Sequence, residues 1–193
     1  MIMKPEVLAP SFAPECLTEI APTDILQHGP TKMYVDHFLW FSPEIGAAAA
    51  YRPTEGDVKD HFDVFRGVDQ VESFAQGTAV AACTFLESQK RGLSLPEFQD
   101  NWNIAFLGVE QVKLHKFLRK GEVFVSLAQI DFYRFRQMTV SGKTYRVPGD
   151  LDLRTYFESY TETAFKTYQL PADFELIGEI EGLKVSVLPK TKF

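Results

Sequence analysis

Two titratable side chains, His61 and Glu72, could together form a general acid–base pair. A neutral imidazole titrates close to physiological pH, so His61 could take a proton from a substrate. Asp60 and Asp63 flank this histidine, however, and nearby carboxylates favour the imidazolium form, which cannot accept a proton. The competing interpretation is that His61 is a solvated loop residue.

Glu72 belongs to a segment rich in alanine and glycine, where burying an ionised carboxylate is costly. We therefore expect the pKa of Glu72 to rise toward a value suited to proton donation. Gln76 lies one helical turn later and could hold Glu72 or a bound water in place. The alternative is that both residues belong to a solvent-facing stripe, together with Asp69, Ser73 and Gly77.

The N-terminus of a helix is predicted shortly before Glu72, at Gly67 and Val68. Glycine lets a ligand approach the backbone closely, and the free N–H groups and dipole of a helix N-terminus could hold an oxygen that gains negative charge. Asp69, in the first turn, would instead simply favour the helix dipole. One short stretch thus supplies a candidate base, a candidate acid and candidate anion-stabilising amides.

The other histidines and the cysteines show no comparable pattern. His28, His37 and His115 are isolated, and neither an HExxH motif nor a Gly-x-Ser-x-Gly elbow is present. Cys16 and Cys83 have no close cysteine or histidine, which is typical of a reducing environment. We expect these histidines to be structural, with His37, beside Asp36, the most notable of them, and we predict no metal and no cofactor.

The apolar pattern predicts the elements that must position the site. The segment Gly67–Arg91 has apolar residues at helical spacing and is the longest predicted helix. Its many small residues allow it to lie close against a sheet, so we expect it inside the domain. Strands are predicted at 31–41, 45–52, 104–117, 122–140 and 174–188, with turns at Ser141-Gly142 and Glu181-Gly182.

A second helix, rich in tyrosine and phenylalanine, is predicted over 150–168, inside an insertion of about 139–172. This insertion could cap a ligand channel or extend an oligomer interface. Prolines mark residues 1–24 as an N-terminal arm, and residues 25–193 are expected to form a single domain. A curved antiparallel sheet around a central long helix is an α+β architecture, the hotdog fold, here with an extra helix inserted before the last strands.

The composition argues against several classes of function. With 193 residues, of which 45% are hydrophobic, the chain can bury one sizeable core. A net charge of −6 without any run of Lys or Arg makes nucleic acid and membrane surfaces improbable partners. Neither a signal peptide nor a transmembrane stretch is evident, so we expect a cytoplasmic location. The seventeen phenylalanines fit either an ordinary core or an aromatic channel.

Several motifs, in the same order along the chain, resemble those of the 3-hydroxyacyl-(acyl carrier protein) dehydratase family. The family's opening motif is similar to residues 25–30 and 33–36, and its catalytic His-Phe pair to His61-Phe62. Its helix is similar to Gly67-Val68 followed by Glu72–Gln76, and its later strands to residues 106–110, 117, 121–122 and 178–185. The resemblance covers about residues 25–135 and 174–188.

This resemblance implies a hydro-lyase that converts a 3-hydroxyacyl thioester to the trans-2-enoyl thioester. His61 would abstract the α-proton, Glu72 would protonate the departing hydroxyl, and the Gly67 and Val68 amides would stabilise the enolate. The substrate-binding residues implied are Gly67, Val68, Gln76 and Phe62. The resemblance also implies a thioester of acyl carrier protein or coenzyme A as partner, and a homodimer or larger oligomer.

The sequence departs from the family's pattern around the histidine. The loop from His61 to Gly67 is shorter than in the family, Asp60 replaces a glycine, and Arg66 replaces a proline. Two alternatives therefore remain. One is an acyl thioesterase of the same fold, in which Glu72 activates water. The other is a non-catalytic subunit that binds an acyl chain or assembles with an active partner.

Overall fold

The long helix predicted over Gly67–Arg91 forms the centre of the structure, a computed structural model that describes residues 16–190. It consists of α3 (Gly67–Phe74), a π-helical segment η3 (Ala75–Val80) and α4 (Ala81–Arg91), which follow one another without a break. The helix ends at Gly92, whose φ of 63° is a left-handed conformation that glycine adopts at little cost. The prediction of this helix is confirmed.

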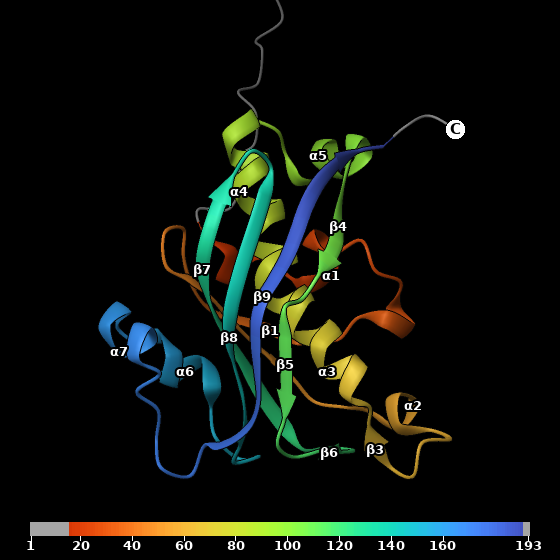
Figure 1. The fold of residues 1–193 in the computed structure, drawn as a ribbon, viewed down its shortest axis with the longest axis vertical. Helices are drawn as coiled ribbons and strands as arrows, with labels where there is room; N and C mark the ends of the chain where they lie inside the picture. The colour runs from red at the N-terminus through yellow and green to blue at the C-terminus, as the bar shows by residue number, and fades with distance from the viewer. Residues whose placement is uncertain (1–15, 191–193) are drawn as a thin grey trace, which may run out of the picture.

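A seven-stranded antiparallel sheet wraps around the helix (Figure 1). The strand order is β1-β2-β7-β8-β9-β4, and β5 also pairs with β9. The strands are β1 (His37–Ser42), β2 (Gly46–Tyr51), β4 (Trp102–Gly108), β5 (Gln111–Leu114), β7 (Val123–Arg134), β8 (Gln137–Val147) and β9 (Glu175–Pro189). Strands β4 and β5, which both pair with β9, therefore form one edge of the sheet, and β1 forms the other.

The helix lies close to the sheet because both surfaces consist of small side chains. Strand β2 contributes the buried run Ala47–Ala50, and a Cβ added to Gly77 would lie 2.6 Å from the Cβ of Ala49. Only glycine fits at position 77 with the helix in this place. One helix inside a curved antiparallel sheet is the α+β hotdog fold, as the sequence predicted.

Several predicted boundaries are wrong. The chain reverses between β7 and β8 at Phe135 and Arg136, which have φ of 53° and 66°, and the predicted turn at Ser141-Gly142 lies inside β8. The predicted turn at Glu181-Gly182 lies within β9, where Gly182 has a φ of 64°. The predicted strand 104–117 is divided into β4 and β5, and the strand predicted from residue 31 begins at His37, after the 3-10 turn η2 (Pro30–Lys32).

The predicted insertion of 139–172 begins too early, since residues 139–147 belong to β8. The segment between β8 and β9 forms two short helices, α6 (Leu153–Glu158) and α7 (Glu162–Thr167), where one was predicted. The break occurs because Thr161 caps a new helix, accepting a hydrogen bond from the amide of Ala164. The aromatic side chains of these helices pack on the outer face of the sheet, where Trp40 and Phe165 stack with centroids 4.0 Å apart. Figure 1 shows α6 and α7 on the opposite side of the sheet from α3.

Short elements complete the described chain: η1 (Leu17–Glu19), α1 (Pro22–Ile25), α2 (Glu55–Val58), β3 (Val64–Phe65), α5 (Leu95–Asn101) and β6 (Leu118–Arg119). Part of the predicted N-terminal arm belongs to the core, since Leu17 and Ile20 are buried beside the central helix. Residues 1–15 of that arm lie outside the described residues. None of the helices in residues 16–190 is long and apolar enough to cross a membrane.

Candidate active site

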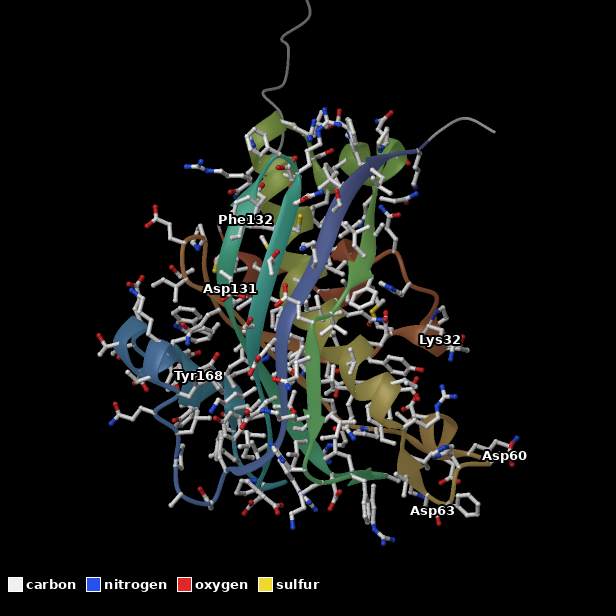
Figure 2. The ribbon with its side chains drawn as sticks, viewed as in Figure 1. Lys32, Asp60, Asp63, Asp131, Phe132 and Tyr168 are labelled. Carbon is white, nitrogen blue, oxygen red and sulfur yellow. The ribbon has the colours of Figure 1, made fainter. Side chains whose placement is uncertain are left out.

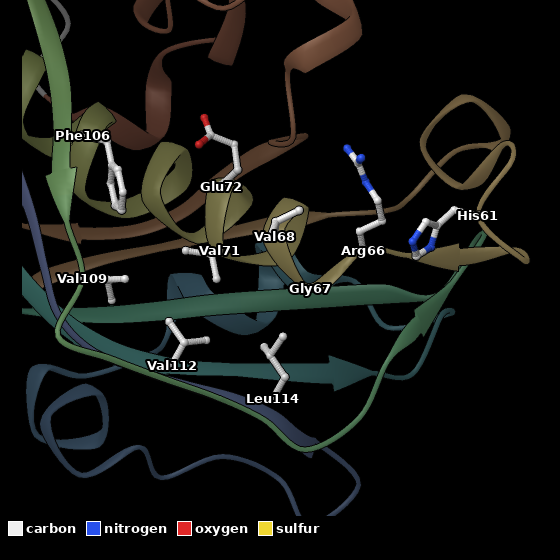
Figure 3. Close-up of a pocket in the computed structure, with 10 residues that line it drawn as sticks. All are labelled: His61, Arg66, Gly67, Val68, Val71, Glu72, Phe106, Val109, Val112 and Leu114. Atoms are coloured by element: carbon white, nitrogen blue, oxygen red, sulfur yellow. The ribbon is translucent and has the colours of Figure 1, made fainter.

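A pocket of about 730 Å³ lies between α3 and the edge strands β4 and β5 (Figure 3). Most of its lining is apolar, and the polar side chains in it are His61, Arg66 and Glu72. The other lining residues are Gly67, Val68, Val71, Phe106, Val109, Val112 and Leu114. A pocket with aliphatic walls and a few polar groups suits a ligand with a long apolar part and one reactive end.

Four of the residues predicted to form a site line this one pocket: His61, Gly67, Val68 and Glu72. Gln76 is fully buried behind Glu72 and does not line it. Phe62 is 93% exposed and is not a lining residue either. Both predicted acid–base residues and the predicted helix N-terminus thus line the pocket, but His61 is exposed and is not hydrogen-bonded to Glu72 within residues 16–190, whereas Gln76 is.

Glu72 is held by two side chains on a single carboxylate oxygen. The Nε2 of Gln76 donates to its Oε1 at 2.8 Å, and the Nε2 of His28 lies 3.3 Å from the same oxygen. The hydrogen bond with His28 is the main cause of a lowered pKa for Glu72, which outweighs the opposing effect of partial burial. The predicted rise of this pKa is therefore wrong, because His28 reaches the helix from a distant part of the chain.

The polar stripe on the helix faces another segment of the chain, and the predicted solvent-facing stripe is wrong for four of its members, one of which is Gly77, buried against Ala49 of β2. Asp69, Ser73 and Gln76 are buried. Ser73 Oγ donates to the carbonyl of Tyr34 at 2.7 Å, and Gln76 accepts from the amide of Tyr34 at 2.9 Å. Gln76 also donates to the carbonyl of Lys32 at 2.8 Å. The stripe thus fastens the segment that precedes β1 to α3.

The His61 loop is tight and strained. Asp60, Phe62 and Asp63 all have left-handed φ values, of 61°, 56° and 58°, and this conformation costs roughly 1–2 kcal/mol for a residue with a Cβ. The amide of His61 donates to Val58 O, and its carbonyl accepts from Val64 N, each at 3.0 Å. Asp60 and Asp63 lie at the outer end of this loop (Figure 2). Such strain is concentrated at functional sites in proteins.

The space that the missing side chain of Gly67 leaves is occupied by Leu114 of β5 and not left for a ligand. A Cβ added to Gly67 would lie 2.4 Å from Cδ1 of Leu114, so the expected close approach to a ligand is taken by strand β5. The helix N-terminus remains available, because within residues 16–190 the amides of Gly67 and Val68 donate no hydrogen bond. Arg66 beside them is paired with Asp69, with Nε and Oδ2 2.6 Å apart.

Of the three histidines expected to be structural, His28 contacts Glu72, a contact that the sequence did not predict, whereas His37 and His115 do not line the pocket. His37 Nδ1 lies 3.0 Å from an Arg154 nitrogen, and His115 Nε2 lies 3.5 Å from Glu179. The opening motif contained His28, but no spacing along the chain relates that motif to α3. Among residues 16–190, no three His, Cys, Asp or Glu side chains gather as a metal site would require.

No protein-family profile matches the chain, and no curated protein shows significant sequence similarity to it. Solved structures do match. The dehydratase heterocomplex ApeI:P from Xenorhabdus doucetiae has a TM-score of 0.58 at 9% identity, over 90% of this chain and 93% of that chain. Two mutants of an acyl-CoA hydrolase from Staphylococcus aureus, each 10% identical, have TM-scores of 0.42 and 0.43, over 76% and 74% of this chain and 67% and 66% of theirs. The similarity to the heterocomplex identifies the chain as a hotdog-fold protein.

Proposed function

We propose that this chain dehydrates a 3-hydroxyacyl thioester of acyl carrier protein or coenzyme A to the trans-2-enoyl thioester. The observation that carries the proposal is an apolar pocket in which an imidazole and a carboxylate are the titratable groups beside a paired arginine. Elimination of water needs one group to take the proton at C2 and one to protonate the hydroxyl leaving C3. The fold shared with a dehydratase heterocomplex accommodates this chemistry.

The lowered pKa of Glu72 favours a division of roles opposite to the one that the resemblance implies. An ionised Glu72 accepts the C2 proton, and His61 donates a proton to the C3 hydroxyl, which leaves as water. The free amides of Gly67 and Val68 stabilise the enolate oxygen of the thioester. Transfer of the proton from Glu72 to His61 through solvent restores both groups.

A thioesterase is the second candidate, and it is favoured by the lowered pKa of Glu72 together with its Oε2, which accepts no hydrogen bond within residues 16–190. A carboxylate with one unoccupied oxygen can activate a water for attack on the thioester carbonyl. The acyl chain would occupy the same pocket, and the bond to sulfur would break in place of the C3–O bond.

A second copy of the chain is the partner we propose for the pocket side of the molecule. Exposed apolar side chains gather there: Val68, Phe106 and Leu114 line the pocket, and Phe62 and Leu107 adjoin lining residues. Monomers rarely expose a large contiguous apolar patch, and the outer edge of β4 and β5 has no strand partner within residues 16–190. A homodimer through this side would cover the mouth of the pocket.

The test is incubation of the purified chain with 3-hydroxyacyl and with saturated acyl thioesters, on both carriers. Formation of enoyl thioester supports dehydration, thiol release from the saturated substrate supports hydrolysis, and the absence of both rejects the two proposals. His61→Ala and Glu72→Gln should each reduce turnover by about a hundredfold or more. His37→Ala is the matched control, since His37 lies outside the pocket. If both pocket variants retain wild-type rates, the assigned residues are wrong.

A further inference from the structure

We propose that His28 is a positioning residue for Glu72, and that it acts with Gln76 to occupy carboxylate oxygen Oε1 so that Oε2 is left for the substrate. This inference rests on the proposed function of Glu72. The contacts of both side chains end on Oε1, and within residues 16–190 no hydrogen bond reaches Oε2. A carboxylate fixed in this way presents one oxygen in a defined direction.

Gln76 has no freedom to release Glu72. It is fully buried, and its amide group donates to the Lys32 carbonyl and to Glu72 while accepting from the Tyr34 amide. Both donor hydrogens of the amide are therefore in use. Gln76 also belongs to the π-helical segment, a rare conformation that is frequent at functional sites. Its position is set by the backbone of the segment before β1.

His28 is anchored by the residues on either side of it. Ile25 and Leu26 are buried in the core, and the Nε2 of Gln27 donates to the carbonyl of Trp102 at 3.0 Å. After His28 the chain enters η2, whose last residue, Lys32, accepts from Gln76. The imidazole is thus held against Glu72 by a segment that is fixed at both ends.

The contacts of the two imidazole nitrogens of His28 support donation to Glu72. The Nδ1 atom of His28 is buried without a hydrogen-bond partner among the described residues. Nε2 is the ring nitrogen that faces Glu72, so the hydrogen available for donation is the one on Nε2. That hydrogen points to Glu72 and stabilises its charged form.

The inference is tested with His28→Ala and His28→Gln, with His37→Ala as control. Glutamine can donate a hydrogen bond but does not titrate. We expect His28→Ala to lower kcat by about tenfold or more with little change in KM, and His28→Gln to restore most of it. Without His28 the pKa of Glu72 should rise, which moves the acidic limb of the pH–rate profile to higher pH. The other charged group that acts on Glu72 is Lys32 before β1, and Arg66 and His61 line the same pocket.

A second readout separates this inference from the proposed function. Carboxyl-labelled glutamate gives the pKa of Glu72 by NMR in each variant, with Glu72→Gln used for assignment. If the wild type turns over no thioester but the pKa of Glu72 rises in His28→Ala and returns in His28→Gln, the contact is correct and the function is wrong. If the wild type is active and depends on Glu72, but His28→Ala leaves kcat, the acidic limb and the NMR pKa unchanged, the positioning role is overturned. A His28→Gln variant as impaired as His28→Ala overturns it as well.

Discussion

Replacing Gly77 with alanine tests how tightly the central helix packs against β2. The added Cβ would lie 2.6 Å from the Cβ of Ala49 and 3.5 Å from Cγ2 of Val35. Carbon atoms prefer separations of roughly 3.5–4.0 Å, so the helix or the strand would have to move. Overpacking costs about 1–3 kcal/mol, while alanine in a helix gains up to about 1 kcal/mol over glycine. We expect the free energy of unfolding to fall by about 1–2 kcal/mol.

Urea unfolding of a double-mutant cycle with Ala49→Gly measures this contact directly. The double variant should recover at least about 1 kcal/mol relative to the sum of the single variants, because the methyl group lost from β2 makes room for the one added to the helix. Gly56→Ala in α2 is the matched control, since its nearest neighbour would be Thr54 Oγ1 at an ordinary 3.7 Å. A Gly77→Ala variant as stable as the wild type, or a cycle without coupling, would refute the packing argument.

Three further predictions concern the pocket and its charge. Val71→Trp should fill much of the pocket and raise KM for long acyl thioesters more than for short ones, as steady-state kinetics over a chain-length series will measure; equal effects on all lengths would contradict an acyl pocket. Val68→Asp should convert a homodimer to monomer in light scattering, because a charge placed in an apolar interface is costly; a wild type that is itself monomeric would contradict the dimer. The lowered pKa of Glu72 stabilises the fold above the ordinary value of 4.5, and this contribution is lost as pH falls through the lowered pKa. The difference in unfolding free energy between wild type and Glu72→Gln should therefore shrink on acidification, whereas a constant difference in urea titrations would show that Glu72 has no shifted pKa.

The central helix, the inner strands and the β1–β2 hairpin could be predicted because local pattern determines them, whereas the position of the β7–β8 hairpin could not. Glycine marks either a turn or a close approach, and the sequence does not distinguish the two. Gly142 lies within β8. It marks a close approach between strands, because a Cβ there would lie 2.0 Å from the Leu127 carbonyl oxygen. The true reversal uses Phe135 and Arg136 in left-handed conformations, which no turn preference of these residue types indicates.

For the candidate site, too, the sequence predicted the residues that are close along the chain but not those that come from distant segments. His61, Gly67, Val68 and Glu72 were predicted together because they are close along the chain, and they do line one pocket. The opposite wall comes from β4 and β5, and the main influence on the charge of Glu72 comes from His28. A helical pattern indicates that a carboxylate lies near a core, but it does not indicate which group reaches it, so the direction of the pKa shift was predicted wrongly.

The polar stripe of α3 distinguishes Glu72 from its neighbours. The segment that contains Lys32 and Tyr34 crosses the helix outside the sheet, so its buried backbone groups need partners other than a neighbouring strand. Ser73 and Gln76 supply them, which gives both residues a structural reason to be polar. Glu72 bonds to no backbone group among the described residues, and its partners are side chains that hold it as a carboxylate at the pocket wall. Glu72 thus adds to stability only through the side chains of His28 and Gln76, and its second oxygen is left for the reaction that we propose.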